Sequence, residues 1–152
     1  MHVIRSNSDN TDFQQLIQSL DEELAARNGT LQGQYTRYNV ITNLGTVVVG
    51  YNDDRPSGCG CFKVFEETTV EIKRMFVTSE NRGSGIAKMI LQELEKWALE
   101  KGFRKAVLET GVKQYEAIAF YTKLGYQRMD NYGQYMGNSN SLCMGKDLSN
   151  VK

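Results

Sequence analysis

Apolar residues recur at helical spacing in three segments of the chain. In each segment, positions three and four residues apart are apolar, and the opposite side carries charged and amide side chains. The last two segments end in a glycine followed by an aromatic residue, which is typical of a C-terminal cap, and Thr11–Gln14 can form a capping box before the first. The pattern predicts helices at residues 12–27, 86–101 and 114–124; residues 32–41 are ambiguous and compatible with a further, shorter helix.

Shorter stretches around these segments show alternating or β-branched residues. Three of them lie between residues 45 and 77 and are separated by turn-forming residues, which predicts an antiparallel meander. The strands before and after the strongest helix are expected to be parallel, because the helix acts as a crossover. The chain therefore reads as α/β, a mixed sheet with helices on its faces, with strands at residues 2–5, 45–51, 58–65, 69–77, 106–110, 126–130 and 141–148.

Composition narrows the classes of function. The chain has 152 residues, which fits one domain spanning residues 1–152. Lys and Arg total 18 and Asp and Glu total 18, so there is no bulk electrostatic attraction to nucleic acid or to an anionic membrane. No apolar run approaches the ~20 residues of a membrane helix, and the N-terminal residues lack the apolar core of a secretory signal. We therefore expect no nucleic-acid partner and no membrane partner.

The cysteines indicate a reducing compartment, because three is an odd number and a chain of this size does not need disulfides. Cys59 and Cys61 occupy alternate positions of a predicted strand, so their side chains point to the same face. A zinc site would need further Cys or His ligands, and His2 is the only histidine. We expect buried free thiols, no metal and a cytoplasmic location.

A glycine-rich turn follows the strand at residues 69–77 and opens the strongest helix. Free N–H groups at a helix start attract anions, glycines let a phosphate approach the backbone, and Arg82 adds a fixed positive charge. The Rossmann fingerprint fails because Lys88 stands at its third glycine, and the Gly-Lys-Ser/Thr of a Walker A loop is absent. The loop does match the pattern R-x-x-G-x-A, with Arg82, Gly85 and Ala87 at its fixed positions. These residues alone leave a phosphate site and an ordinary strand-to-helix turn as equal alternatives.

Three motifs in sequence order resemble the GNAT superfamily of acyl-CoA-dependent N-acetyltransferases. The stretch R-G-S-G-I-A after the strand E-I-K-R-M-F-V is similar to motif A of the family, and Ala117–Tyr121 with Lys123–Tyr126 is similar to its A-I-x-F-Y-x-x-x-G-Y/F segment. The resemblance covers the chain from about residue 45 onward. It implies a mixed central sheet of about six to seven strands, antiparallel in the first half, with a parallel pair at strands four and five that splay apart, flanked by about four helices.

The resemblance also implies how acetyl-CoA binds as cosubstrate. The pantetheine arm would pair as a pseudo-strand with Met75, Phe76 and Val77. Gln114 stands where the family usually has an Asn that meets the cofactor, and it keeps the amide on a side chain one methylene longer. The pyrophosphate would bind the backbone amides of Arg82, Gly83, Ser84, Gly85, Ile86 and Ala87.

Two residues are candidates for proton transfer in the acetylation that the resemblance implies. Glu71 would act as general base through a water, because a primary amine is mostly protonated at neutral pH. The alternative for Glu71 is an exposed strand residue or a partner of Lys73 or Arg74. Tyr121 would protonate the departing thiolate, and a backbone N–H of Phe76 or Val77 would polarise the thioester carbonyl. The alternative for Tyr121 is a buried aromatic in a stripe with Tyr115 and Ile118.

The acceptor is the least determined part of the reaction. Tyr132 and Tyr135, in the polar segment before the last strand, either line the acceptor site or cover the sheet edge in a tight hairpin. Asp21 and Glu22 face either an amine pocket or solvent. We expect an N-acetyltransferase that acts on a primary amine of a small molecule. The alternatives are a protein N-terminal or lysine acetyltransferase and a noncatalytic acyl-CoA-binding module, and a homodimer is left open.

Overall fold

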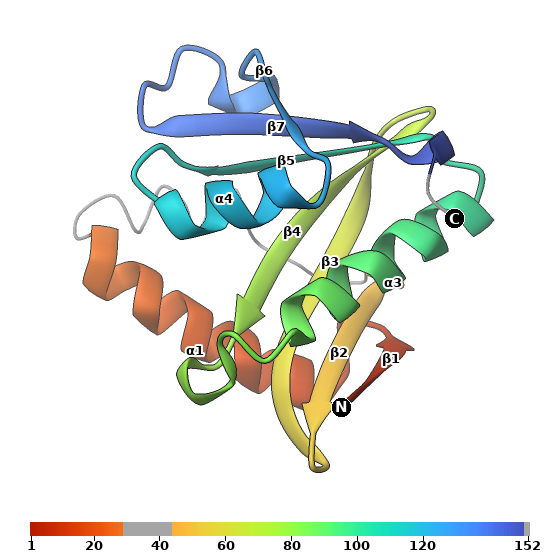
Figure 1. Ribbon diagram of the computed structural model, residues 1–152, viewed down its shortest axis with the longest axis vertical. Coiled ribbons are helices and arrows are strands. Elements are labelled where there is room, and N and C mark those ends of the chain that lie inside the picture. The colour runs from red at the N-terminus through yellow and green to blue at the C-terminus, as the bar shows by residue number, and fades with distance from the viewer. Residues whose placement is uncertain (29–43, 151–152) are drawn as a thin grey trace. The chain divides into compact units, whose positions relative to one another are not determined.

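The computed structural model describes residues 1–28 and 44–150 (Figure 1). It divides into two compact units, which we treat separately. Unit 1 comprises Met1–Lys63 and Ile72–Trp97, and unit 2 comprises Val64–Glu71 and Ala98–Lys152. The expected helix at residues 32–41 lies outside the described residues.

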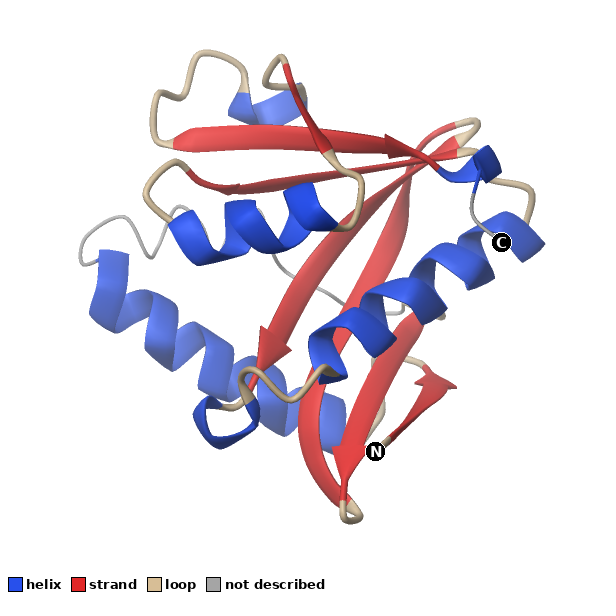
Figure 2. Ribbon diagram, viewed as in Figure 1, coloured by secondary structure: helices blue, strands red, loops and turns tan. Residues whose placement is uncertain are grey.

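Within the described ranges, seven strands follow the order β1-β2-β3-β4-β5-β7-β6, which confirms the expected mixed sheet (Figure 2). Neighbours are antiparallel at β1–β2, β2–β3, β5–β7 and β6–β7, and β4 pairs with β5 in parallel. The parallel ladder covers three residue pairs, from Thr69↔Lys105 to Glu71↔Val107. The strands are β1 His2–Ser6, β2 Val47–Asn52, β3 Arg55–Glu66, β4 Thr69–Val77, β5 Lys105–Gly111, β6 Gln127–Met129 and β7 Ser141–Asp147.

The described residues form three α-helices, α1 Thr11–Asn28, α3 Ile86–Glu100 and α4 Tyr115–Lys123, at the positions that the periodicity predicts. Both expected C-terminal caps are confirmed. Gly102 has φ +95° and the Phe103 amide donates to the Ala98 carbonyl at 3.0 Å. In the same way, Gly125 has φ +100° and the Tyr126 amide donates to the Tyr121 carbonyl at 3.0 Å. A left-handed glycine and a 6→1 backbone hydrogen bond are the features of a Schellman motif.

The predicted capping box at Thr11 is wrong by one residue. The side-chain oxygen of Asn10 accepts from the Phe13 amide at 2.9 Å, so Asn10 is the N-cap. The Gln14 side chain donates to the Ser8 carbonyl at 3.2 Å instead of closing a box. Asn caps a helix at least as well as Thr, and its position one residue earlier decides where α1 begins.

In unit 1, α1 packs against β2, β3 and β4. Phe13 and Leu16 form a buried cluster with Val47, Val49, Cys59, Cys61 and Phe76. The two thiols are buried and free, as predicted, and they donate to the carbonyls of Arg74 and Lys73 in β4. A Cβ at Gly50 would lie 2.8 Å from the Ile86 side chain, so glycine there lets the start of α3 pack closely on β2.

In unit 2, β5 and β7 pair over seven residues, from Lys105↔Asp147 to Gly111↔Ser141. Figure 2 shows α4 on one side of this pair and the loop with the short 3₁₀ turn η3, Gly133–Tyr135, on the other. Val107 and Cys143 pack there with Tyr132 and Tyr135. This cluster carries side chains that the sequence singled out, so it places part of the candidate site. No helix among the described residues is long and apolar enough to cross a membrane.

Candidate active site

The loop between β4 and α3 has the backbone of an anion site. It passes through the 3₁₀ turn η2, Ser79–Asn81, and then through two glycines in the left-handed region, Gly83 at φ +83° and Gly85 at φ +94°. An added Cβ at either glycine would meet nothing within 4 Å, so backbone conformation and not packing requires glycine there. The first-turn amides of α3 have no intrahelical partner, and together with the helix dipole they favour an anion such as a pyrophosphate.

Hydrogen bonds fix this loop to β2 and β3. The Thr78 amide donates to the Ser57 carbonyl at 2.9 Å. Asn81 donates from its side chain to the Thr78 hydroxyl at 2.8 Å and accepts from the Asn52 side chain at 2.9 Å. Asn81 therefore positions the anion site, a role that sequence reasoning missed because its partner Asn52 lies 29 residues away.

Arg82, the predicted phosphate-binding cation, is exposed and paired within unit 1. One terminal nitrogen donates to both carboxylate oxygens of Glu23 in α1, at 3.0 and 2.7 Å. Its Nε donates to the Val77 carbonyl at 3.1 Å. An anion at the loop therefore competes with Glu23 for this guanidinium, a partner that the sequence did not indicate.

The predicted pantetheine-binding residues occupy the end of β4. Phe76 is buried, and Met75 and Val77 are half-buried. They lie beyond the last pair of the β4–β5 ladder, Glu71↔Val107. The residue just before them, Arg74, has φ +59°, an uncommon conformation for a non-glycine residue that interrupts the regular strand.

Glu71 is buried, with 2% of its surface exposed, so the exposed alternative is wrong. The hydroxyl of Tyr132 donates to its carboxylate at 2.8 Å within unit 2. In unit 1, the Arg74 guanidinium donates to Asp21 at 2.6 Å. Asp21 thus faces an arginine of β4 rather than solvent alone. The contact between Glu71 and Tyr132 joins residues 61 positions apart, and no sequence signal predicted it.

Tyr132 and Tyr135, the predicted acceptor-lining residues, are 8% and 3% exposed. Tyr132 packs edge-on against Phe65 at 4.8 Å and against Tyr135 at 5.7 Å between ring centroids. The pKa of Tyr132 is raised well above its usual range, mainly by burial. The charge of Glu71 and the hydrogen bond to it raise this pKa further. Burial, followed by the charges of Glu109 and Glu71, raises the pKa of Tyr135. Both phenols therefore stay protonated, and Tyr132 presents its O–H to the Glu71 carboxylate on β4.

Tyr121 lies in the last turn of α4 in unit 2 and is 9% exposed. Its ring packs against Phe120 and Tyr126, with centroids 5.2 and 5.7 Å away. Burial raises its pKa well above the usual range, so the phenol keeps its proton. The buried stripe proposed as the alternative is incomplete, because Tyr115 is 73% exposed. Gln114 is the half-buried N-cap residue of the same helix, and its backbone N–H donates to the Gly111 carbonyl at 3.0 Å.

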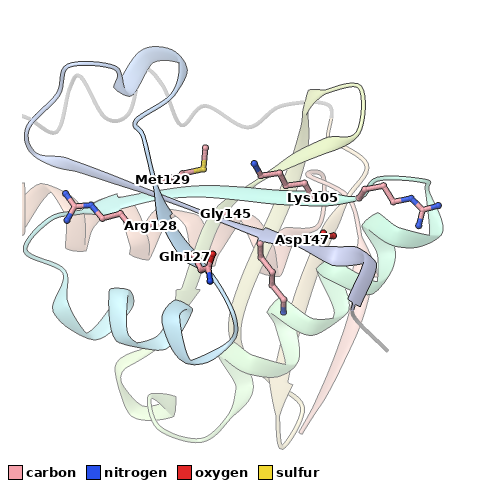
Figure 3. Close-up of a pocket in the computed structure, with 8 residues that line it drawn as sticks. Lys105, Gln127, Arg128, Met129, Gly145 and Asp147 are labelled. Atoms are coloured by element: carbon pink, nitrogen blue, oxygen red, sulfur yellow. The ribbon is translucent and has the colours of Figure 1, made fainter.

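A separate cavity of about 440 Å³ lies on β5, β6 and β7 in unit 2, and none of the predicted site residues line it (Figure 3). Lys105 and Met129 flank Gly145, and the side chain of Arg128 points away from the Lys105 ammonium. The charges therefore do not converge on one ligand position. Among residues 1–28 and 44–150, no group of three His, Cys, Asp or Glu side chains could hold a metal ion.

Comparison with known proteins agrees with this geometry. Residues 13–126 match the model of the acetyltransferase (GNAT) family. The chain is 35% identical to an IAA acetyltransferase of Azospirillum brasilense over 145 residues, 88% of this chain and 89% of the relative. A Klebsiella pneumoniae structure described as an acyl-CoA N-acyltransferase superposes with a TM-score of 0.78 at 28% identity over 97% of both chains.

A more distant structure, solved with coenzyme A, shares the fold. The PaiA N-acetyltransferase of Thermoplasma acidophilum, in complex with coenzyme A, has a TM-score of 0.70 at 16% identity and covers 96% of this chain and 98% of its own. The glycine-rich loop, the mixed sheet and these similarities lead to one conclusion. The chain belongs to the GNAT family of acetyltransferases and is an acyl-CoA-dependent N-acetyltransferase with acetyl-CoA as cosubstrate.

Proposed function

We propose that the protein transfers acetyl directly from acetyl-CoA to a primary amine of a small molecule. The observation that carries this proposal is the buried carboxylate of Glu71, on the same strand as the expected pantetheine-binding residues. A buried carboxylate is unfavourable unless hydrogen bonds compensate for its lost hydration. Tyr132 supplies such a bond. A noncatalytic acyl-CoA-binding module has no use for this arrangement, which therefore favours an enzyme.

Two features of unit 1 would hold the cosubstrate. The amides from Arg82 to Ala87 would bind the pyrophosphate, since the open space at Gly83 and Gly85 lets it approach the backbone. The backbone of Met75–Val77 lies beyond the β4–β5 ladder and would pair with the pantetheine arm. Arg82 would exchange Glu23 for a phosphate oxygen.

Glu71 would take a proton from the amine through a water molecule. A primary amine like that of Lys has a pKa near ~10.4, so almost all of it is protonated at neutral pH. Once neutral, the nitrogen attacks the thioester carbonyl carbon, a C–N bond forms and the C–S bond breaks. The nitrogen then releases one further proton to water and becomes a neutral amide. A backbone N–H of Phe76 or Val77 would stabilise the charge that develops on the carbonyl oxygen.

Tyr121 would donate its proton to the departing thiolate, and its phenolate would then regain a proton from water. Because burial raises the pKa of its phenol, the proton-carrying form is present throughout the neutral range. No acyl-enzyme is needed. Cys143 is 0% exposed and burial raises the pKa of its thiol, so it is poorly suited as a nucleophile. Most of the acceleration would come from holding amine and thioester together.

A small acceptor is favoured over a protein because the acceptor-side groups are buried. Glu71, Tyr132 and Tyr135 are each less than a tenth exposed. A small amine reaches such groups more easily than a side chain carried on a folded protein.

The test is thiol release from acetyl-CoA in the presence of a panel of small primary amines. We expect turnover with at least one class of amine. Glu71→Gln should lower kcat/KM about 10²–10⁴-fold without changing acetyl-CoA affinity, since that is the usual contribution of a general base. Glu67→Gln, an exposed carboxylate in the turn before β4, is the matched control and should behave as wild type. Acetyl-CoA binding without turnover on any amine would identify a binding module and overturn the proposal.

A further inference from the structure

Arg82 is the one charged residue of the segment Arg82–Ala87, which is expected to bind the pyrophosphate. Contacts within unit 1 hold its guanidinium in place. Nε donates to the Val77 carbonyl at 3.1 Å, and a terminal nitrogen donates to Glu23. The guanidinium carbon lies 6.0 Å from the centre of the Phe76 ring. These contacts keep the positive charge at the end of β4, beside the loop.

The contact between Arg82 and Glu23 has the form of a bound anion. One terminal nitrogen of Arg82 lies 3.0 and 2.7 Å from the two carboxylate oxygens of Glu23. Both side chains are open to solvent, with 46% of the Arg82 side chain and 32% of the Glu23 side chain exposed. Arginine binds carboxylates and phosphates through the same N–H groups. A phosphate can therefore reach this guanidinium from solvent, and it meets a carboxylate that is already in place.

The charge of Glu23 opposes a phosphate at Arg82 whether or not the carboxylate leaves. If the carboxylate stays, two anions lie beside one guanidinium and repel each other. If it leaves, the ion pair must first be broken. Orientation of the guanidinium does not depend on Glu23 alone, because the Val77 carbonyl and the Phe76 ring also contact it. The net effect of Glu23 is therefore to lower the affinity of the loop for a pyrophosphate.

We propose that Glu23 is a built-in competitor of the cosubstrate, which weakens the binding of acetyl-CoA and of CoA and speeds the release of CoA. This inference rests on the proposed binding of the pyrophosphate at the loop. Acetyl-CoA and CoA carry the same pyrophosphate, so an anion site that binds the substrate tightly also retains the product. Product release limits kcat in many enzymes. A carboxylate that returns to Arg82 as the phosphate leaves shortens the lifetime of the CoA complex.

Calorimetric titration of Glu23→Gln with acetyl-CoA and with CoA tests the proposal. Glutamine keeps the length of the side chain and removes its charge. Both ligands should bind about three- to fivefold more tightly than to the wild type at low salt, which is the size of effect that an exposed ion pair produces. This gain should shrink at about 1 M salt, where the Debye length is about 3 Å. A purely structural role of Glu23 would produce no such salt-dependent gain.

Two further variants assign the gain to the contact with Arg82. Glu22→Gln makes the same change of charge at the neighbouring, exposed position of α1 and should bind acetyl-CoA as the wild type does. In an Arg82→Gln background, Glu23→Gln should lose most of its gain, because its partner is absent. The rate constant of CoA dissociation, measured by displacement in a stopped-flow instrument, should fall in Glu23→Gln by about the same factor as the dissociation constant.

The outcomes separate this inference from the proposed site. If Arg82→Gln weakens acetyl-CoA binding but Glu23→Gln does not strengthen it, the competitor role is overturned and the pyrophosphate site stands. An equal gain in Glu22→Gln would assign the effect to overall charge and overturn the role of Glu23. Tighter binding with an unchanged rate of CoA dissociation would overturn the effect on release. Wild-type affinity in Arg82→Gln would overturn both the proposed binding of phosphate by Arg82 and this inference.

Discussion

The glycine loop of unit 1 and the Glu71–Tyr132 pair of unit 2 represent two ways of building a functional site. The loop site depends on backbone conformation, because Gly83 and Gly85 have positive φ and open space around them. The pair consists of side chains: both residues are buried and joined by a bond of 2.8 Å. The loop is formed by consecutive residues, so its function can be predicted from the sequence. The pair depends on residues 61 positions apart and becomes visible only in the folded chain.

This contrast predicts different responses to mutation. Changes in the loop should affect cosubstrate binding and leave the chemistry alone. Changes at the Glu71–Tyr132 pair and at Tyr121 should affect turnover and leave cosubstrate binding alone.

Gly85→Glu should have the largest effect on cosubstrate binding. The glutamate residue would have to adopt φ +94°, and its side chain would place a negative charge where the pyrophosphate is expected. Acetyl-CoA affinity should fall at least 100-fold, about 3 kcal/mol, as measured by calorimetric titration. Gly102→Glu is a matched control, because Gly102 has φ +95° and equally open space but closes the other end of α3. It should lose about 1 kcal/mol of stability and keep its affinity. Similar affinity losses in both variants would show that strain, and not the site, is responsible.

Tyr121→Phe should have the next largest effect. The ring and its contacts with Phe120 and Tyr126 remain, and only the hydroxyl is lost. We expect kcat to fall about 10²-fold, the lower end for a general acid, with acetyl-CoA affinity unchanged. Tyr115→Phe, at an exposed position of the same helix, is the control. An unaffected kcat in steady-state assays would return Tyr121 to a packing role.

Tyr132→Phe should lower kcat by about tenfold, because a hydrogen bond to a charged group contributes about 1.5–3 kcal/mol and part of that is recovered from water. The edge-on contacts with Phe65 and Tyr135 are kept. The critical measurement is a double-mutant cycle with Glu71→Gln. If Tyr132 acts through Glu71, its substitution should cost little in the Glu71→Gln background. Additive losses would instead mean that Tyr132 contacts the acceptor by itself.

The sequence predicts more of the fold than of the site, for physical reasons. β4 and the C-caps at Gly102 and Gly125 depend on neighbouring residues, and the prediction was correct for each. The capping box at Thr11 failed because two adjacent residues could cap the helix and Asn10 does so.

The missed site contacts are all long-range. Asp21 reaches Arg74 across 53 positions and Glu23 reaches Arg82 across 59. In the sequence these carboxylates belong to the predicted solvent-facing side of a helix. Periodicity predicts which residues are buried, but it does not predict which polar residue contacts a partner. The left-handed φ of Arg74 has no local signal either, since no glycine or asparagine marks it.

The smallest expected effect concerns the attachment of α1 in unit 1. The Tyr51 hydroxyl donates to Asp12 at 2.6 Å, and burial, followed by this hydrogen bond, raises the pKa of Tyr51 to about 12. A raised pKa means that the folded state holds this proton more tightly than the unfolded chain, whose tyrosine titrates near ~10. The stability from this group is therefore fully present below pH ~10 and is lost as the pH rises towards 12.

Tyr51→Phe removes both the hydrogen bond and the titration. The variant should be less stable at pH 8 by about 0.5–1.5 kcal/mol, the net value of one hydrogen bond. Between pH 10 and 12 its stability should fall less steeply than that of the wild type, because one proton fewer is linked to unfolding. Urea unfolding at pH 8, 10 and 11 measures both quantities. The buried tyrosines of unit 2 titrate in both proteins, so they cancel in the difference between the two slopes. Parallel slopes would mean that Tyr51 ionises equally well in the folded and unfolded chain, and that its bond to Asp12 does not hold the start of α1 in solution.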